Sequence, residues 1–490
     1  DKVQEFSFAD IDRFSSASLI TRMTNDVNAM TMMLNMGLRM LVRAPVMLIA
    51  ALGISISINP RLAVVLLVVI PLMILAIGIL MKICTKLFEV MQTKIDGLNN
   101  TLQENLVAIR VVKAFVREDH ERKKFQRSND ELMMAGLNVG MKVIAIMPIM
   151  MLAMNGATVA VLYLGGKMVM AEGFLLGDLQ AFINYIFQIL ISVMMVAMAL
   201  LQLTRAQACA HRINEVLSAE PSVENKPQAQ RPAQDELPAP RGRVEFRDVS
   251  FHYPSSDKNV LEHITFQAKR GETVAFIGAT GSGKTTLVSL AARFYDATEG
   301  TVLVDGVDVR DYTFDALYDR IGYVTQKAIL FSGDVRGNVL FGASRGKDSD
   351  ADVQKALELA QASEFVDRMP GGIHAPIAEG GTNVSGGQKQ RLSIARALAR
   401  RPEILVFDDS FSALDYRTDT RLRAGLDREL KDTTRLIVAQ RIGTIRNADK
   451  IIVLDEGRMV GMGTHEELMQ TCPIYQEIAR SQLSQEELGA

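Results

Sequence analysis

The chain has 490 residues, of which 48% are hydrophobic and 22% are charged. This length is too great for one hydrophobic core, and so much apolar sequence predicts an apolar part joined to an ordinary globular part. A net charge of −2 gives no sign of a nucleic-acid partner, and the three scattered cysteines give no disulfide framework and no metal-ligand spacing.

The opening segment of about 35 residues is polar and amphipathic, and serines near residue 15 are expected to open a helix that carries Arg22, Asn25 and Asp26. The chain starts at Asp1 with a charged segment, without an initiator Met or a signal peptide. We therefore interpret it as a fragment that lacks upstream sequence.

Apolar segments long enough to cross a membrane come next. Residues 62–81, 143–164 and 179–204 carry no formal charge over about twenty residues or more, which is the length of a transmembrane helix. Residues 44–58 form a shorter apolar run, which can still span the membrane because the side chains of Arg39 and Arg43 can snorkel to its surface. Such charge-free runs make buried helices of a soluble protein the weaker alternative.

The long connection between the second and third spans, residues 82–142, is rich in Lys and Arg, which places it in the cytosol by the positive-inside rule. Few helix breakers interrupt it, so we expect two antiparallel helices that reach roughly 40 Å below the bilayer. Residues 107–120 would form the tip, and an amphipathic tip so far from lipid needs a protein surface to dock on. A solvated hairpin is the alternative.

Five prolines among polar residues make 217–241 an extended linker. After it, strand-like runs alternate with helical segments, which predicts an α/β domain from residue 242. The strand-like runs are 244–246, 273–277, 301–304, 404–407, 436–439 and 450–454.

A phosphate-binding loop follows the second of these strands. It consists of Gly278, Ala279, Thr280, Gly281, Ser282, Gly283, Lys284 and Thr285, with Thr286 opening a helix. In this strand–loop–helix context the pattern predicts backbone N–H groups around the phosphates of ATP, with Lys284 on the β- and γ-phosphates. The Thr285 hydroxyl and the Asp408 carboxylate, at the end of an apolar strand, suit Mg²⁺.

The stretch from 382 to 415 holds a second anion-binding loop at a helix start, then the helix, a buried strand and the pair Asp408–Asp409. Its loop residues are Ser385, Gly386, Gly387 and Gln388, and it closes at Asp415. This order resembles the signature motif, Walker B motif and D-loop of ATP-binding cassette (ABC) ATPases.

The resemblance implies a multidomain fold class: an all-α transmembrane helical domain of the ABC exporter type (1–216), the linker (217–241), an α/β P-loop ATPase domain with a helical signature subdomain (242–478), and a tail (479–490). By the same comparison, Tyr253 stacks on adenine, and Gln326 lies at the metal. Glu379 resembles the acidic residue that meets the coupling helices, and the signature loop and Asp415 complete the ATP site of a partner subunit.

Two positions depart from the family pattern. The usual catalytic Glu after the Walker B Asp is Asp409, whose carboxylate is retracted by about 1.5 Å, one C–C bond. The usual His is Gln440, which can donate a hydrogen bond but cannot carry a proton. We expect a site that binds ATP well and hydrolyses it poorly, as in the degenerate half of bacterial heterodimeric multidrug exporters.

The expected function is ATP-driven export of amphipathic or hydrophobic small molecules across the cytoplasmic membrane of a bacterium, by a multi-pass protein that contacts lipid and has its ATPase domain in the cytosol. The partner would be a second half-transporter with a complete catalytic site. A homodimeric lipid or peptide exporter and a membrane-bound ATP-sensing regulator are the alternatives; the charge-free spans oppose a soluble ABC ATPase. Asn155, Asn184 and Gln188 are candidates for a substrate path, although helix–helix hydrogen bonds are the commoner role of such residues.

Overall fold

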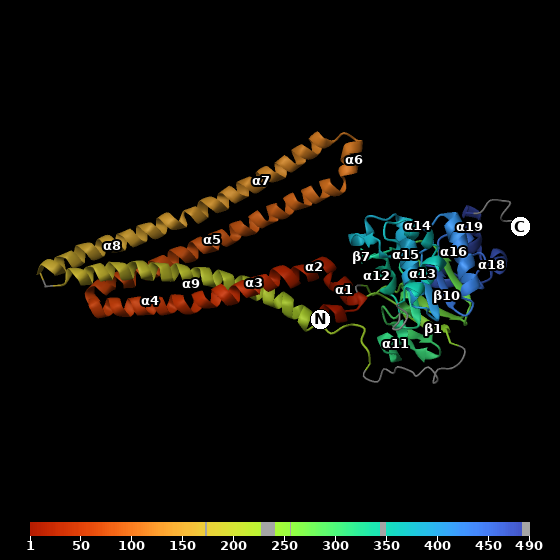
Figure 1. Cartoon of the computed structure of the whole chain (residues 1–490). Coiled ribbons are helices and arrows are strands. Elements are labelled where there is room, and N and C mark those ends of the chain that lie inside the picture. Colours follow the sequence, from red (N-terminus) through yellow and green to blue (C-terminus); the bar gives the residue numbers. More distant parts are fainter. Residues whose placement is uncertain (172–173, 227–240, 255, 344–348, 483–490) are drawn as a thin grey trace. The chain divides into compact units, whose positions relative to one another are not determined.

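The computed structural model describes residues 1–171, 174–226, 241–254, 256–343 and 349–482 (Figure 1). Its contacts divide the chain into two compact units, Ala17–Ser218 and a unit of Asp1–Ser16 with Ala219–Ala490. The predicted linker falls partly outside the described residues, at 227–240, and so does most of the predicted tail, at 483–490.

Long helices make up the unit Ala17–Ser218, and four of its described helical stretches are long and apolar enough to cross a membrane. The elements are α2 (Ser16–Thr21), the π-helical turn η2 (Arg22–Asp26), α3 (Val27–Met32), the π-helical turn η3 (Met33–Gly37), α4 (Leu38–Ile58), α5 (Pro60–Val107), α6 (Ile109–Ala114), α7 (Glu118–Ile144), α8 (Ile146–Ala171) and α9 (Leu176–Leu217).

Local chemistry sets the start of α5. The Asn59 side chain accepts hydrogen bonds from the backbone N–H groups of Arg61 and Leu62, and Pro60 takes the first helical position. Both features favour a helix start, because the first N–H groups of a helix have no partner inside it. Buried Leu62, Leu66 and Phe182 then join α5 to α9 in an apolar core.

The predicted cytosolic hairpin is present as α5 and α7, which run side by side and are joined by α6 (Figure 1). Ion pairs connect the two helices, from Lys94 to Glu131 at 2.8 Å and from Lys124 to Glu104 at 2.7 Å. At the tip, Phe115 and Val116 are 73% and 80% exposed. The described part of the chain therefore ends this hairpin in an uncovered apolar surface.

The later unit contains a six-stranded sheet of order β12-β11-β3-β10-β9-β6, in which only β12 runs antiparallel to its neighbour. A four-stranded antiparallel sheet, β2-β1-β4-β5, packs its inner face on the same core. The strands are β1 (Val244–Phe251), β2 (Leu261–Ala268), β3 (Thr273–Gly278), β4 (Glu299–Val304), β5 (Val307–Asp308), β6 (Ile321–Val324), β9 (Ile404–Asp408), β10 (Thr434–Val438), β11 (Lys450–Asp455) and β12 (Arg458–Gly463), with a separate pair β7 (Gly333–Asp334) and β8 (Pro376–Ile377).

Helices cover this sheet and form a subdomain of their own. Those of the subdomain are α12 (Val335–Leu340), α13 (Asp350–Leu359), α14 (Ser363–Asp367) and α15 (Gly386–Ala399). The others are α10 (Lys284–Ala291), α11 (Phe314–Tyr318), α16 (Tyr416–Glu429), α17 (Ile442–Ile445), α18 (His465–Thr471) and α19 (Pro473–Gln482). The fold class is therefore the one predicted, a helical domain followed by an α/β domain with a helical subdomain.

The first residues of the chain pack on the later unit, although the sequence analysis assigned them to the helical domain. They form η1 (Lys2–Glu5) and α1 (Phe8–Phe14). The rings of Phe8 and Phe294 lie 4.7 Å apart, and the Tyr295 hydroxyl donates to the Asp12 carboxylate at 3.0 Å. Sequence reasoning missed these contacts because they join residues more than half of the chain apart.

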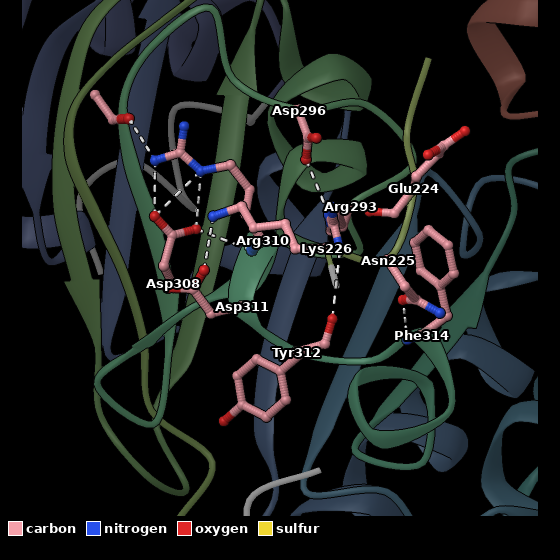
Figure 2. Close-up of polar contacts among 11 residues, drawn as sticks. Glu224, Asn225, Lys226, Arg293, Asp296, Asp308, Arg310, Asp311, Tyr312 and Phe314 are labelled. Atoms are coloured by element: carbon pink, nitrogen blue, oxygen red, sulfur yellow. Dashed lines mark hydrogen bonds and ion pairs between the residues drawn. The ribbon is translucent and has the colours of Figure 1, made fainter. Parts of the chain in front are cut away.

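The described start of the linker is fastened to the same unit (Figure 2). Buried Arg293 donates to the Glu224 carbonyl at 2.7 Å and to the Asp296 carboxylate at 3.0 Å. The Asn225 side chain accepts from the Phe314 N–H at 2.9 Å, and Lys226 pairs with Asp311 at 2.6 Å. These contacts hold residues 224–226, at the start of the predicted linker, against the later unit.

Candidate functional site

The phosphate-binding loop joins β3 to α10. Gly281 and Gly283 have φ of 86° and 93°, values that L side chains rarely adopt, and a Cβ on Gly283 would lie 2.7 Å from Leu261 Cδ2. Lys284 Nζ donates to the carbonyl oxygens of Gly278 and Ala279, at 2.9 and 2.7 Å. Burial lowers the pKa of Lys284, so this ammonium group gains most from an anion beside it.

The predicted metal ligands meet at the carboxyl ends of the parallel strands. The Thr285 hydroxyl donates to Asp408 Oδ1 at 2.7 Å, and the Tyr323 hydroxyl also interacts with this carboxylate. Burial raises the pKa of Asp408, and a nearby cation would offset the cost of its charge. Hydroxyl and carboxylate oxygens are hard ligands, so the donor set fits Mg²⁺.

Asp409, Gln440 and Gln326 come together beside this pair. Val438 lies opposite Asp408 in the register of β10 and β9, so residues that follow the two strands are neighbours. Gln440 Nε2 donates to Asp409 Oδ2 at 2.8 Å, and Gln326 Nε2 lies 3.4 Å from the same oxygen. Burial raises the pKa of Asp409. One carboxylate oxygen is thus occupied by neutral amides.

These residues line one cavity of about 410 Å³. Its lining comprises Val260, Thr280, Gly281, Gly283, Lys284, Thr285, Thr286, Gln326, Asp409, Val438 and Gln440. Tyr253 stands beside it, because its hydroxyl lies 2.9 Å from the Thr286 hydroxyl. This half-buried ring also meets Tyr295 edge to face, with centroids 5.3 Å apart.

The signature residues lie elsewhere in the described unit and do not line this cavity. Ser385 caps α15 and accepts from the N–H of Gln388, whose side chain accepts from the Ser385 N–H in return. Gly386 and Gly387 form the first turn of this helix, and Ser385 and Gly386 are exposed. Asp415 caps α16 and accepts from the Thr418 N–H at 2.9 Å.

Comparisons with known proteins match both parts of the chain. Residues 1–194 match the model of the ABC transporter transmembrane region, and residues 261–412 match that of the ABC transporter. An uncharacterized ABC transporter ATP-binding protein of Mycobacterium tuberculosis is 41% identical over 480 residues, 97% of this chain and 81% of that protein. The chain belongs to the ABC transporter family.

This ABC transporter is of the exporter type. It is 33% identical to an ATP-dependent lipid A-core flippase of Desulfotalea psychrophila, over 94% of this chain and 79% of that protein. A bacterial Atm1-family ABC exporter with ATP bound has the same fold, with a TM-score of 0.80, 26% identity and coverage of 99% of this chain and 84% of that one. This protein is therefore a multi-pass half-transporter whose ATPase domain binds ATP and couples hydrolysis to transport, as a dimer with a partner half.

Sequence reasoning missed several residues around the site. Tyr323 on β6 reaches Asp408, and Ser412 Oγ donates to the Asp409 carbonyl at 2.8 Å. Gln482, the last described residue of α19, contacts the backbone next to Gln440. The Ser412 contact is local to the turn after β9, whereas the contacts of Tyr323 and Gln482 depend on how distant strands and helices pack.

Proposed function

We propose that this chain is the hydrolysis-impaired half of a heterodimeric exporter that moves amphipathic or hydrophobic compounds across a bacterial cytoplasmic membrane. The observation that carries the proposal is the 2.8 Å hydrogen bond from Gln440 to Asp409. A general base needs a free oxygen within reach of the attacking water. The side chain of Asp409 is one methylene shorter than that of the family's Glu. The uncharged Gln440 amide donates a hydrogen bond to one of its carboxylate oxygens.

ATP binding is supported by the rest of the cavity. Lys284 would bind the β- and γ-phosphates and Tyr253 would stack on adenine. Thr285 and Asp408 would hold Mg²⁺, with Gln326 beside it. The metal neutralises charge on the phosphates when it is bound. With binding groups present and hydrolytic groups weakened, nucleotide at this site acts chiefly to hold two subunits together.

The partner subunit completes the arrangement. Ser385, Gly386, Gly387 and Gln388 are exposed or half-buried at the start of α15, where the positive end of the helix dipole favours a phosphate. They contact ATP held by the partner, whose own Glu and His perform most of the hydrolysis. Asp415 lies at the same interface.

The transported class is supported by the helical unit. Side chains of α5 and α8 line an apolar cavity of about 730 Å³, which includes Val69, Met73, Met150 and Leu152. Apolar and flexible Met side chains suit hydrophobic or amphipathic compounds. Of the proposed polar contacts in this unit, Asn155 and Asn184 are exposed and Gln188 is half-buried.

A homodimeric lipid exporter is the second candidate, because a 33% identical relative is described as a lipid A-core flippase. In proteoliposomes, movement of a fluorescent phospholipid by the lone chain favours this candidate. Movement of an amphipathic or hydrophobic dye only by the chain with its partner favours the heterodimer.

ATP turnover by the lone chain tests the proposal. We expect slow hydrolysis by the native chain in nanodiscs and a gain of about 100-fold in D409E/Q440H, because a misplacement near 1 Å can cost about that factor. D257E, at an exposed carboxylate, is the control for an added methylene. Fast hydrolysis by the native chain, without a gain in the double variant, contradicts the proposal.

A further inference from the structure

The loop that carries Gln440 is held by a side chain from the last described helix. Gln482 Nε2 donates to the Gln440 carbonyl oxygen at 2.7 Å, and Gln482 Oε1 accepts from the Ile442 N–H at 2.8 Å. One amide group therefore bridges two backbone positions that flank Arg441. Gln440 in turn donates to Asp409 at 2.8 Å, so two side chains connect the end of α19 to the carboxylate of the ATPase site.

The loop of residues 440–442 needs a hydrogen-bond acceptor from another element. Helix α17 begins at Ile442, and its N-cap residue, Arg441, makes no side-chain capping hydrogen bond. The first N–H groups of a helix have no acceptor inside it, and an external acceptor fixes where the helix starts. Gln482 supplies that acceptor from another element.

Helix α19 is itself firmly placed, so its last turn can hold the loop in one position. Tyr475 and Ala479 are fully buried, and the Tyr475 hydroxyl lies 2.7 Å from His465 Nδ1. Gln476, six residues before Gln482 on the same helix, donates instead to the Met469 carbonyl at 3.0 Å. The two glutamines thus share a helix and an amide chemistry but differ in what they contact.

We propose that Gln482 is a positioning residue of the ATPase site, which fixes the backbone of residues 440–442 and so sets where the side chain at 440 stands against residue 409. The inference rests on the proposed role of position 440. Because both hydrogen bonds of Gln482 go to backbone atoms of the loop, they persist when Gln440 is replaced by His. Gln482 therefore holds the same backbone atoms in D409E/Q440H, in which the Glu and His of the family pattern are present.

Hydrogen exchange on the full chain tests the placement without any hydrolysis. In the native background we expect Q482A to accelerate exchange of the Ile442 amide at least fivefold, because that N–H loses its acceptor. Q482E keeps an acceptor for Ile442 but no donor for the Gln440 carbonyl, so its exchange rate lies between those of native and Q482A. Q476A leaves the Ile442 amide unchanged. Equal exchange in native and Q482A overturns the inference.

Turnover in the D409E/Q440H background tests the consequence. We expect Q482A to lower kcat about threefold to tenfold, in keeping with the loss of one or two partly exposed hydrogen bonds, while KM for ATP stays within about twofold. The kcat of Q482E lies between the kcat of D409E/Q440H and that of its Q482A derivative. Q476A changes neither kcat nor KM. A kcat for Q482A equal to that of Q476A removes the positioning role. If D409E/Q440H itself gains no activity, the proposed function fails, and the exchange result still decides the placement.

Discussion

Asp409 has an uncommon backbone conformation, and burial makes the negative charge of its carboxylate unfavourable. Its φ of 47° lies in the left-handed region, and its N–H donates to the Val438 carbonyl at 3.1 Å. The residue as a whole is 7% exposed. Asp tolerates this conformation better than most residues. The neighbouring strand thus fixes the carboxylate beside Gln440, and the resulting pair is the residue-scale basis of the proposed slow hydrolysis.

The raised pKa of Asp409 predicts a pH-dependent effect on stability. A raised folded pKa means that the folded protein holds this proton more tightly than the unfolded chain, so stability is lost as the pH rises through the folded pKa. We expect D409N, which keeps an oxygen acceptor for Gln440, to raise the Tm of the nucleotide-free protein by about 1–3 °C at pH 7.5 and by less at pH 4.

The control for this experiment is D257N, which neutralises an exposed carboxylate of the same unit. It should leave the Tm unchanged at both pH values. An equal gain from D409N at pH 4 and pH 7.5 would mean that the charge of Asp409 is not what costs stability.

At the scale of elements, the linker start is fixed by one buried cation. Arg293 is 2% exposed, bonds the Glu224 carbonyl and the Asp296 carboxylate, and stacks on Phe314 at 5.1 Å (Figure 2). Ser222, also at the linker start, donates hydrogen bonds from its N–H and its hydroxyl to the Asp10 carboxylate, at 3.0 and 2.6 Å. Helix α1, the linker start and the α/β domain are thus joined by polar contacts within one unit.

We expect R293M to lower the Tm of the protein by roughly 5–10 °C, because it leaves the Asp296 carboxylate and two carbonyl oxygens without their donor, at a cost of about 3 kcal/mol. The matched variant R270M removes a pair with Asp432 that lies 3.3 Å apart on the surface, and it should change the Tm by 1 °C or less. Differential scanning fluorimetry in detergent gives both values. Similar shifts in the two variants would refute the role of Arg293.

Elements with a strong pattern could be predicted from the sequence. The charge-free spans, the α5–α7 hairpin and the phosphate-binding loop follow from length, charge and glycine spacing. Strands β2 and β12 were not predicted. The alternation of polar and apolar residues in β2 is a strand pattern that the sequence analysis overlooked, whereas glycines weaken the strand pattern of β12. The bond between Gln440 and Asp409 depends on the register of β9 and β10, which no local pattern encodes.

At the scale of the whole molecule, we predict that the hairpin tip docks on a protein surface. Phe115 and Val116 are largely exposed, and exposed apolar side chains favour such an interaction. We expect F115A/V116A to reduce transport per ATP hydrolysed at least fivefold while the Tm stays the same, because exposed substitutions change stability little. Lys123, exposed on α7, supplies the control K123A. Unchanged transport by F115A/V116A would show that the tip does not transmit ATP binding to the membrane helices.

The composition of the transporter purified from its native membranes with ATP and Mg²⁺ tests the central claim most directly. Affinity-purified complexes, analysed by mass spectrometry of the chains and by chromatography of the bound nucleotide after one turnover, should contain this chain with a different ABC subunit that has Glu and His at the matching positions. One ATP per dimer should remain intact. A dimer of identical chains with both nucleotides converted to ADP would contradict the account.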